Sequence, residues 1–186
     1  MAGDSLVALI ANIAFADRIF GVLLFGAAAF SKLRHFDEFV SIVARYLTMP
    51  LSVARIAAVM VLGLEILTVG LLCLPVAGHA GAVLAISLLL LFAVAMALAL
   101  LRGETQLDCG CMSTALRQRV RWTLVVRNVL MALLFLPMLT RPDLPAEPLA
   151  LMDGLAAGIV LFILYLATDV LVALDASFAD LKRRYG

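Results

Sequence analysis

Two cysteines separated by one glycine are the residues of this chain best suited to chemistry. Cys109, Gly110 and Cys111 follow Asp108 in the sequence. A disulfide between the two cysteines closes a very small ring, and Gly110 permits the unusual backbone angles that such a ring needs. A ring this tight departs from relaxed disulfide geometry, and strain makes a disulfide easier to reduce. The pair is therefore better suited to thiol–disulfide exchange than to holding a fold together.

Two other interpretations of the cysteine pair stay open. Metal ligation needs further ligands, because a structural zinc site takes four, and the two histidines, His35 and His79, are distant in sequence. Two small residues in a tight turn need no chemistry at all. We expect no metal centre. The third cysteine, Cys73, lies in an apolar stretch and is expected to pack as a small hydrophobe.

The composition indicates that most of this chain is surrounded by lipid. Of its 186 residues, 65% are apolar and 15% are charged, and the mean hydropathy is +1.14. Soluble domains are about 45–50% apolar and about 25% charged. A soluble enzyme and an extracellular disulfide scaffold are thus excluded. With 14 Lys and Arg against 13 Asp and Glu, the chain also lacks the basic field that nucleic acids require, so we expect no nucleic-acid partner.

Apolar stretches of about 20 residues predict five membrane-spanning helices. They cover residues 6–30, 56–76, 80–101, 122–139 and 149–174. Residues 36–47 carry apolar side chains at helical spacing and predict a short amphipathic helix in the membrane interface. Residues 102–121 form a polar segment that contains the cysteine pair. We therefore expect one membrane domain over residues 1–186, an all-α, five-span helical bundle.

Charged side chains inside the spans are expected to have a structural or functional role, because inserting each one into a bilayer core costs at least about 2.5–3.5 kcal/mol. Asp17 and Arg18 are expected to be paired inward or to lie near an interface. Glu65 is either a proton carrier beside a redox centre or a structural hydrogen-bond partner of Arg18 or Asn128. Arg127 either assists the chemistry as a charge or extends to the interface.

Small residues inside the spans predict close helix packing. The glycines expected to serve in this way are Gly21, Gly26, Gly63 and Gly70. In the last span, Asp169 is expected to be a helix-end group.

Lysine and arginine are distributed unevenly between the loops. Residues 31–55 and 102–121 are rich in them, residues 77–79 have none, and residues 140–148 have Arg141 alone. Loops rich in these residues usually stay in the cytoplasm. With five spans, the charge rule places the N-terminus outside, and it places the C-terminus and the cysteine segment inside.

A series of short motifs resembles the MauE family within the broader MauE/DoxX membrane proteins. The motifs are Ser31-Lys32-Leu33 at the end of the first span, Tyr46 and Pro50 before the second, Glu65 and Gly70 inside it, Asp108-Cys109-Gly110-Cys111 after the third, and Arg127-Asn128 in the fourth. The length and the five-span layout agree over nearly the whole chain. The family usually continues the cysteine motif with Phe-Gly, where this chain has Met112-Ser113.

The resemblance implies a multi-pass protein of the bacterial inner membrane that is needed to mature methylamine dehydrogenase. The expected client is the small subunit of that enzyme, which is disulfide-dense, and the expected companion is a periplasmic thioredoxin-like protein. A client that folds in the periplasm conflicts with the cytoplasmic side that the charge rule gives to the cysteine segment.

The main hypothesis is a thiol–disulfide relay through Cys109 and Cys111, which would make the protein a thiol–disulfide oxidoreductase. By analogy with other membrane disulfide enzymes, electrons would pass to a quinone, with Glu65 as proton carrier and Arg127 as assisting charge. The alternative is a non-catalytic scaffold that docks the client or the thioredoxin-like partner. A scaffold predicts that the cysteines are dispensable, whereas residues 36–47 and 102–121 are not.

Overall fold

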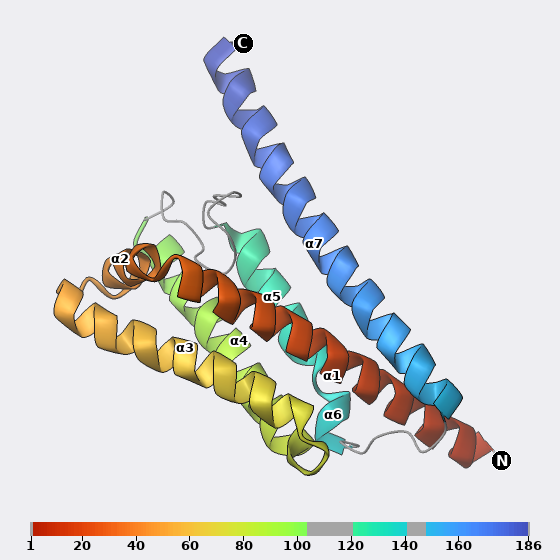
Figure 1. The fold of residues 1–186 in the computed structure, drawn as a ribbon. Helices are drawn as coiled ribbons and strands as arrows, with labels where there is room; N and C mark the ends of the chain where they lie inside the picture. The colour runs from red at the N-terminus through yellow and green to blue at the C-terminus, as the bar shows by residue number, and fades with distance from the viewer. Residues whose placement is uncertain (1, 104–120, 141–147, 186) are drawn as a thin grey trace.

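The computed structural model describes residues 2–103, 121–140 and 148–185. These residues form helices and no strand (Figure 1). In chain order the helices are α1 (Ala2–Arg34), α2 (Phe36–Leu47), α3 (Leu51–Cys73), the short 3-10 helix η1 (Pro75–Ala77), α4 (Gly78–Leu101), α5 (Trp122–Leu134), α6 (Pro137–Thr140) and α7 (Pro148–Tyr185).

Five helical segments of the described chain are long and apolar enough to cross a membrane. They are Ala8–Arg34, Leu51–Cys73, Pro75–Leu101, Trp122–Thr140 and Pro148–Leu171. Such segments satisfy every backbone polar group internally, which the bilayer core requires. The prediction of an all-α, five-span membrane bundle is therefore confirmed.

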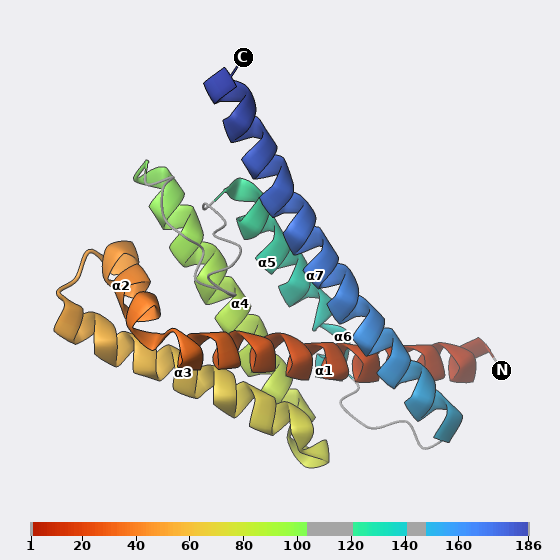
Figure 2. The same cartoon turned by 45° about the horizontal axis from the view of Figure 1, so that its top comes forward.

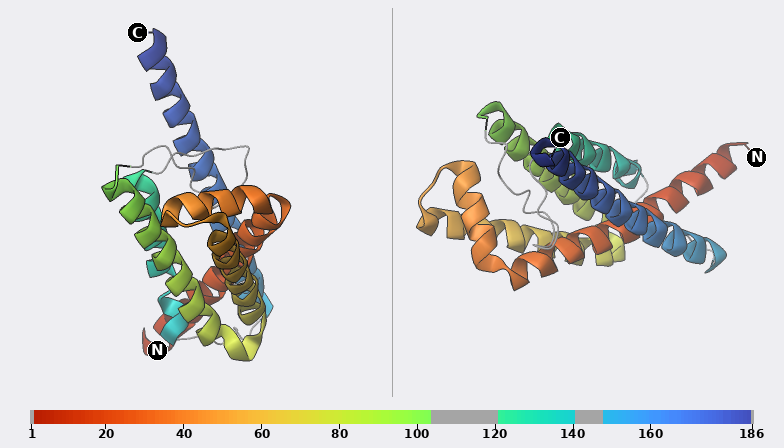
Figure 3. Two further views of the ribbon diagram at one scale, coloured as in Figure 1. Left: turned by 90° about the vertical axis from the view of Figure 1, so that its left-hand side faces the viewer. Right: turned by 90° about the horizontal axis from the view of Figure 1, so that it is seen from above.

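Helix α1 is the central element of the bundle. It packs along α3 on one side and α7 on the other, and it also contacts α6, while α4 packs between α3 and α5 (Figures 1 and 2). The C-terminal part of α7 extends beyond the ends of the other helices (Figures 1 and 3). The largest apolar core lies where α1, α4 and the α5–α6 region meet, around Phe20 and Phe135.

The amphipathic helix predicted for residues 36–47 is α2. Phe39 and Val40 are buried against α3, whereas Arg45 on the other face is exposed. Thr48 ends the helix in the left-handed region, with a φ of 51°. Pro50 is the N-cap residue that precedes α3, where the missing N–H of proline costs no helical hydrogen bond. The two helices therefore pack side by side at one end of the bundle.

Two connections differ from the expected boundaries. Helix α3 begins at Leu51 rather than at residue 56, because Arg55 in its first turns projects outward and pairs with Asp37 of α2 at 3.1 Å. A charge at that place does not interrupt the helix. The turn between α3 and α4 is formed by Leu74 and η1, so α4 already begins at Gly78, whereas the expected spans were 56–76 and 80–101.

Only one of the four glycines singled out in the sequence makes a close helix contact. A methyl group at Gly21 would lie 2.8 Å from side-chain carbons of both Leu72 and Phe135. The prediction is wrong for the other three, because no heavy atom of another element lies within 4 Å of that position. These three are Gly26, Gly63 and Gly70. The close contacts between α1 and α7 are made instead by Gly154 and Gly158.

Candidate functional site

The cysteine pair belongs to a segment whose two ends are described. Cys109 and Cys111 themselves lie outside the described residues. Before the segment, Arg102 Nη1 donates a hydrogen bond to the backbone oxygen of Tyr46 at 3.2 Å, which ties the end of α4 to the end of α2. After it, α5 begins at Trp122, at the same end of the bundle as α2 (Figures 1 and 3). The two described flanks of the segment thus lie at the end of the bundle that carries α2.

Glu65, the proposed proton carrier, forms a buried ion pair with Lys32. Lys32 Nζ lies 2.6 Å from Glu65 Oε1, and the exposed fractions of the two side chains are 3% and 0%. Glu65 thus has a structural partner on a neighbouring helix, but that partner is Lys32 and neither Arg18 nor Asn128, the two examples named from the sequence. Asn128 Nδ2 donates to the carbonyl oxygen of Leu124 in its own helix at 3.2 Å. The pair joins α1 to α3 inside the bundle.

Lys32 is also enclosed by two aromatic rings from two further helices. Its Nζ lies 5.2 Å from the ring centroid of Phe39 in α2 and 5.5 Å from that of Phe92 in α4. Cation–π contacts are strongest where the cation is desolvated, as it is here. Four helices therefore converge on one ammonium group. The sequence identified Lys32 only as part of the motif Ser31-Lys32-Leu33. Its position near the end of an apolar span could have indicated that its charge faces inward.

Arg18 caps the C-terminal end of α3. Its Nε donates to the carbonyl oxygen of Leu72 and its Nη2 to that of Leu74. The last carbonyls of a helix have no partner within the helix and carry partial negative charge, so a guanidinium satisfies them well. Cys73, which lies between the two carbonyls in the chain, has an exposed side chain. The expectation that Cys73 is buried as a small hydrophobe is therefore wrong.

Asp17 does not form the inward pair expected for the neighbours Asp17 and Arg18. Asp17 is buried, and neither of its carboxyl oxygens has a hydrogen-bond partner in the described chain. Asp17 therefore points inward without pairing with Arg18. The side chains of adjacent residues leave a helix in different directions, so the two do not meet.

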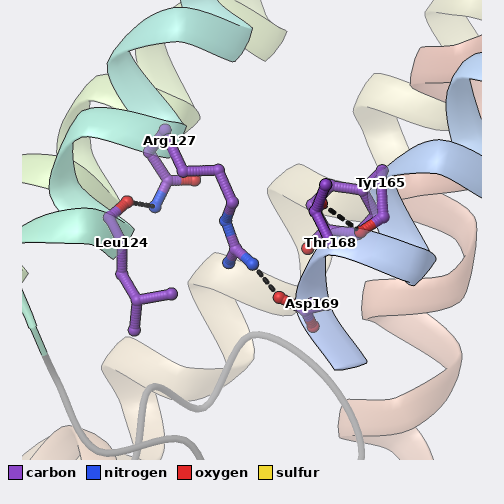
Figure 4. Close-up of polar contacts among 6 residues, drawn as sticks. Leu124, Arg127, Tyr165, Thr168 and Asp169 are labelled. Carbon is purple, nitrogen blue, oxygen red and sulfur yellow. Dashed lines mark hydrogen bonds and ion pairs between the residues drawn. The ribbon is translucent and has the colours of Figure 1, made fainter. Parts of the chain in front are cut away.

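Arg127, the proposed assisting charge, points from α5 toward α7 (Figure 4). It forms an ion pair with Asp169, and its guanidinium carbon lies 5.0 Å from the ring centroid of Tyr165. It does not extend to the interface as an isolated cation. Asp169 is not a helix-end group, because α7 continues to Tyr185. The pair links α5 to the part of α7 that diverges from the bundle.

The charges inside the described spans therefore act mainly as ties between helices. Glu65 is held by α1 and Arg127 by α7, so the two candidate helpers of the cysteine pair belong to separate polar clusters. Ion pairs of this kind fix helix positions in an apolar medium, where an unpaired charge is costly. These pairs hold the described helices α1 and α3, and α5 and α7, in a defined arrangement.

Comparison with known proteins places the chain in a family. The family model "Methylamine utilisation protein MauE" matches residues 9–140. The chain is 43% identical to methylamine utilization protein MauE of Paracoccus denitrificans over 168 residues, which are 88% of this chain and 89% of the relative. It is 39% identical to the protein of the same name from Methylorubrum extorquens, over 80% of this chain and 81% of the relative.

A third relative extends the match. The MauE protein of Paracoccus versutus is 34% identical over 91% of this chain and 94% of its own length. No solved structure matches the chain. The family model covers the first four spans and the motifs described above, and the chain belongs to the MauE family of methylamine utilisation proteins.

Proposed function

We propose that this protein acts in methylamine utilisation as a thiol–disulfide exchange protein of the bacterial inner membrane. Its substrate is the disulfide-dense small subunit of methylamine dehydrogenase, and its redox partner is a periplasmic thioredoxin-like protein. The observation that carries the proposal is the Cys109-Gly110-Cys111 stretch in a membrane chain of the MauE family. The names of the relatives support the methylamine system, and the two cysteines support the chemistry.

The exchange needs both cysteines. A thiolate of the pair attacks one sulfur of a client disulfide, a mixed disulfide forms, and the other client sulfur leaves as a thiolate. The second cysteine of the pair then attacks the mixed disulfide. The client leaves as a dithiol, Cys109 and Cys111 are joined, and two electrons have passed to the client. The thioredoxin-like partner, in its dithiol form, reduces the pair and is itself oxidised.

The same steps in reverse form disulfides in the client. The pair then begins as a disulfide and accepts two electrons from two client thiols, and the oxidised thioredoxin-like partner restores it. Both directions place the cysteine pair on the periplasmic side in this proposal, because the client folds there.

Glu65 and Arg127 enter the proposal as structural charges. Each is bound to a side chain of opposite charge on another helix, and these ties position the helices that carry the cysteine segment. The exchange steps above run between the cysteine pair, the client and the thioredoxin-like partner, so no step of the proposal runs through a quinone.

The test is replacement of the two cysteines in the living cell. In a strain that lacks this protein, the Cys109→Ser, Cys111→Ser double variant is expected to leave the dehydrogenase inactive, with unpaired thiols in its small subunit. The matched control is Cys73→Ser, which removes an exposed cysteine at the other end of α3 and is expected to support normal maturation. Normal maturation with the double variant overturns the exchange mechanism.

A non-catalytic scaffold is the second candidate, and the rigid seating of α2 favours it. Lys32 lies over Phe39 of α2, and Arg102 binds the Tyr46 carbonyl, so the exposed face of α2 is presented in a fixed position. A scaffold requires that face and not the thiols. Substitution of the exposed Arg45 and Ser41 would then block maturation, while the double cysteine variant would not.

A further inference from the structure

Asp17 is a buried carboxyl group that the proposed thiol chemistry does not use. Its residue is 1% exposed, and neither Oδ1 nor Oδ2 has a hydrogen-bond partner in the described chain. Buried polar groups are nearly always paired, so an unpaired one needs an explanation. Asp17 also lies inside the first candidate span, where no bulk water is available.

The surroundings of Asp17 are apolar. One turn further along α1, the ring of Phe20 stacks on that of Phe135 with centroids 6.1 Å apart. Gly21, four residues after Asp17 and on the same face, lies against side chains of Leu72 and Phe135. Phe135 itself lies in the break between α5 and α6, and α6 contacts α1. Asp17 is therefore enclosed by apolar side chains and by helices packed on α1.

Arg18, the next residue in the chain, and the charged groups of the α5–α7 pair have other partners. The guanidinium of Arg18 binds the carbonyl oxygens at the end of α3. Tyr165 of α7 packs edge-on against Phe20, and the neighbouring Asp169 is paired with Arg127. No cation among the described residues compensates a negative charge on Asp17.

An ionised carboxylate without a partner is strongly disfavoured in such a place, and the group takes up a proton instead. Glu65 is the internal contrast, since its carboxylate has Lys32 Nζ at 2.6 Å. We propose that Asp17 is a proton-binding site of the bundle, a carboxylic acid that is neutral at rest, while Glu65 stays ionised. This moves the proton-carrying role that the sequence suggested for Glu65 to a different helix. It does not depend on thiol exchange.

Infrared spectroscopy of the full-length protein in lipid tests the proposal without any assay of activity. A protonated carboxyl has a carbonyl band separate from the bands of carboxylates. The band is expected in the wild type, lost in Asp17→Asn, and retained in Glu65→Gln and in the exposed control Asp37→Asn. Absence of the band from the wild type, or its loss in Glu65→Gln with retention in Asp17→Asn, overturns the proposal.

A second experiment needs no variant, in case Asp17→Asn does not fold. Dicyclohexylcarbodiimide is apolar, and it adds to a protonated carboxyl to give an O-acylisourea that rearranges to a stable N-acylurea. Mass spectrometry of the treated wild type is expected to find one adduct, on Asp17, and none on Glu65. An adduct on Glu65 in place of Asp17 overturns the proposal.

Discussion

Lys32 Nζ of α1 lies 2.6 Å from Glu65 Oε1 of α3, and neither side chain is accessible to solvent. The two residues are far apart in the chain, and the rings of Phe39 and Phe92 close the site from α2 and α4. The ion pair and the two ring contacts therefore join four helices, among them α2, whose end is also bound by Arg102.

Breaking this pair is expected to destabilise the bundle strongly. Lys32→Met removes the partner of the buried Glu65 carboxyl, and breaking a buried pair in this way costs about 3–5 kcal/mol. The double variant Lys32→Met, Glu65→Leu removes both charges and should lose much less than the sum of the single losses. Unfolding by detergent titration measures the free energies of unfolding for the complete double-mutant cycle.

The exposed pair between Arg55 and Asp37 is the matched control for that cycle. Its side chains are 64% and 88% exposed, and such pairs contribute about 0–1 kcal/mol. Arg55→Met is therefore expected to change stability little. Equal losses for Lys32→Met and Arg55→Met would contradict the structural role of the buried pair.

Arg127 is expected to hold α7 near α5. Most packing of α7 is against α1, so the Arg127–Asp169 pair is an important link across to α5. Spin labels on cysteines placed at the exposed Val126 and Val170, in a background without native cysteines, report the distance between the helices. Arg127→Met should broaden the distance distribution and shift it to longer values.

The control for the α5–α7 link is Thr168→Ala. Thr168 Oγ1 donates to the Tyr165 carbonyl within α7, so its loss should leave the distance distribution unchanged. If Arg127→Met behaves like Thr168→Ala, the ion pair does not position α7.

Gly158 is expected to be essential for the packing of α7 on α1. A methyl group there would lie 2.6 Å from Ile19 Cβ and 2.7 Å from the Ala16 backbone oxygen, neither of which can move away easily. Gly158→Ala should therefore lower the free energy of unfolding. Gly63→Ala meets no atom within 4 Å and should be neutral, or stabilising by about 0.5–1 kcal/mol through helix propensity. The same detergent titration compares the two, and a larger loss at Gly63 would contradict the packing.

The membrane side of the cysteine pair follows from the proposed client. In spheroplasts, a membrane-impermeant maleimide is expected to label Cys109 from outside in a protein that keeps this cysteine alone. A protein that keeps only Cys73, which is exposed at the opposite end of α3, is expected to react only after the membrane is opened. The charge rule predicts the reverse labelling pattern. That reverse pattern would contradict direct thiol–disulfide exchange between the cysteine pair and a periplasmic client.

Hydropathy alone was enough to predict the five spans, because crossing a bilayer demands long apolar helices whatever their neighbours are. The period of apolar residues likewise predicted α2. The partners of the charges were not predictable in the same way. Lys32 reaches Glu65 only because α1 and α3 pack together at that point. A single sequence does not show which residues of two helices meet.

The roles of the glycines and of Asp17 also depend on tertiary packing, which the sequence pattern does not show. Whether a glycine allows close packing depends on which helix face meets a neighbour, so Gly158 does and Gly63 does not. Asp17 was expected either to pair inward or to lie near an interface because a membrane disfavours charge, but the same cost is avoided when the carboxyl is neutral. Local pattern gives the elements, and tertiary packing decides what each polar side chain does.

The most direct test of the central claim is the thiol state of Cys109 and Cys111 during turnover. Rapid acid quenching of cells growing on methylamine, followed by alkylation and mass spectrometry, separates free thiols, the internal disulfide and mixed disulfides. The account predicts that the pair is found in both thiol and disulfide forms. Without the thioredoxin-like partner, the pair is expected to accumulate in either the thiol or the disulfide form. A variant in which one of the two cysteines is serine is expected to trap a mixed disulfide with the client or the partner. A pair that stays in a single state under all these conditions, with no mixed disulfide, contradicts thiol exchange and leaves the scaffold.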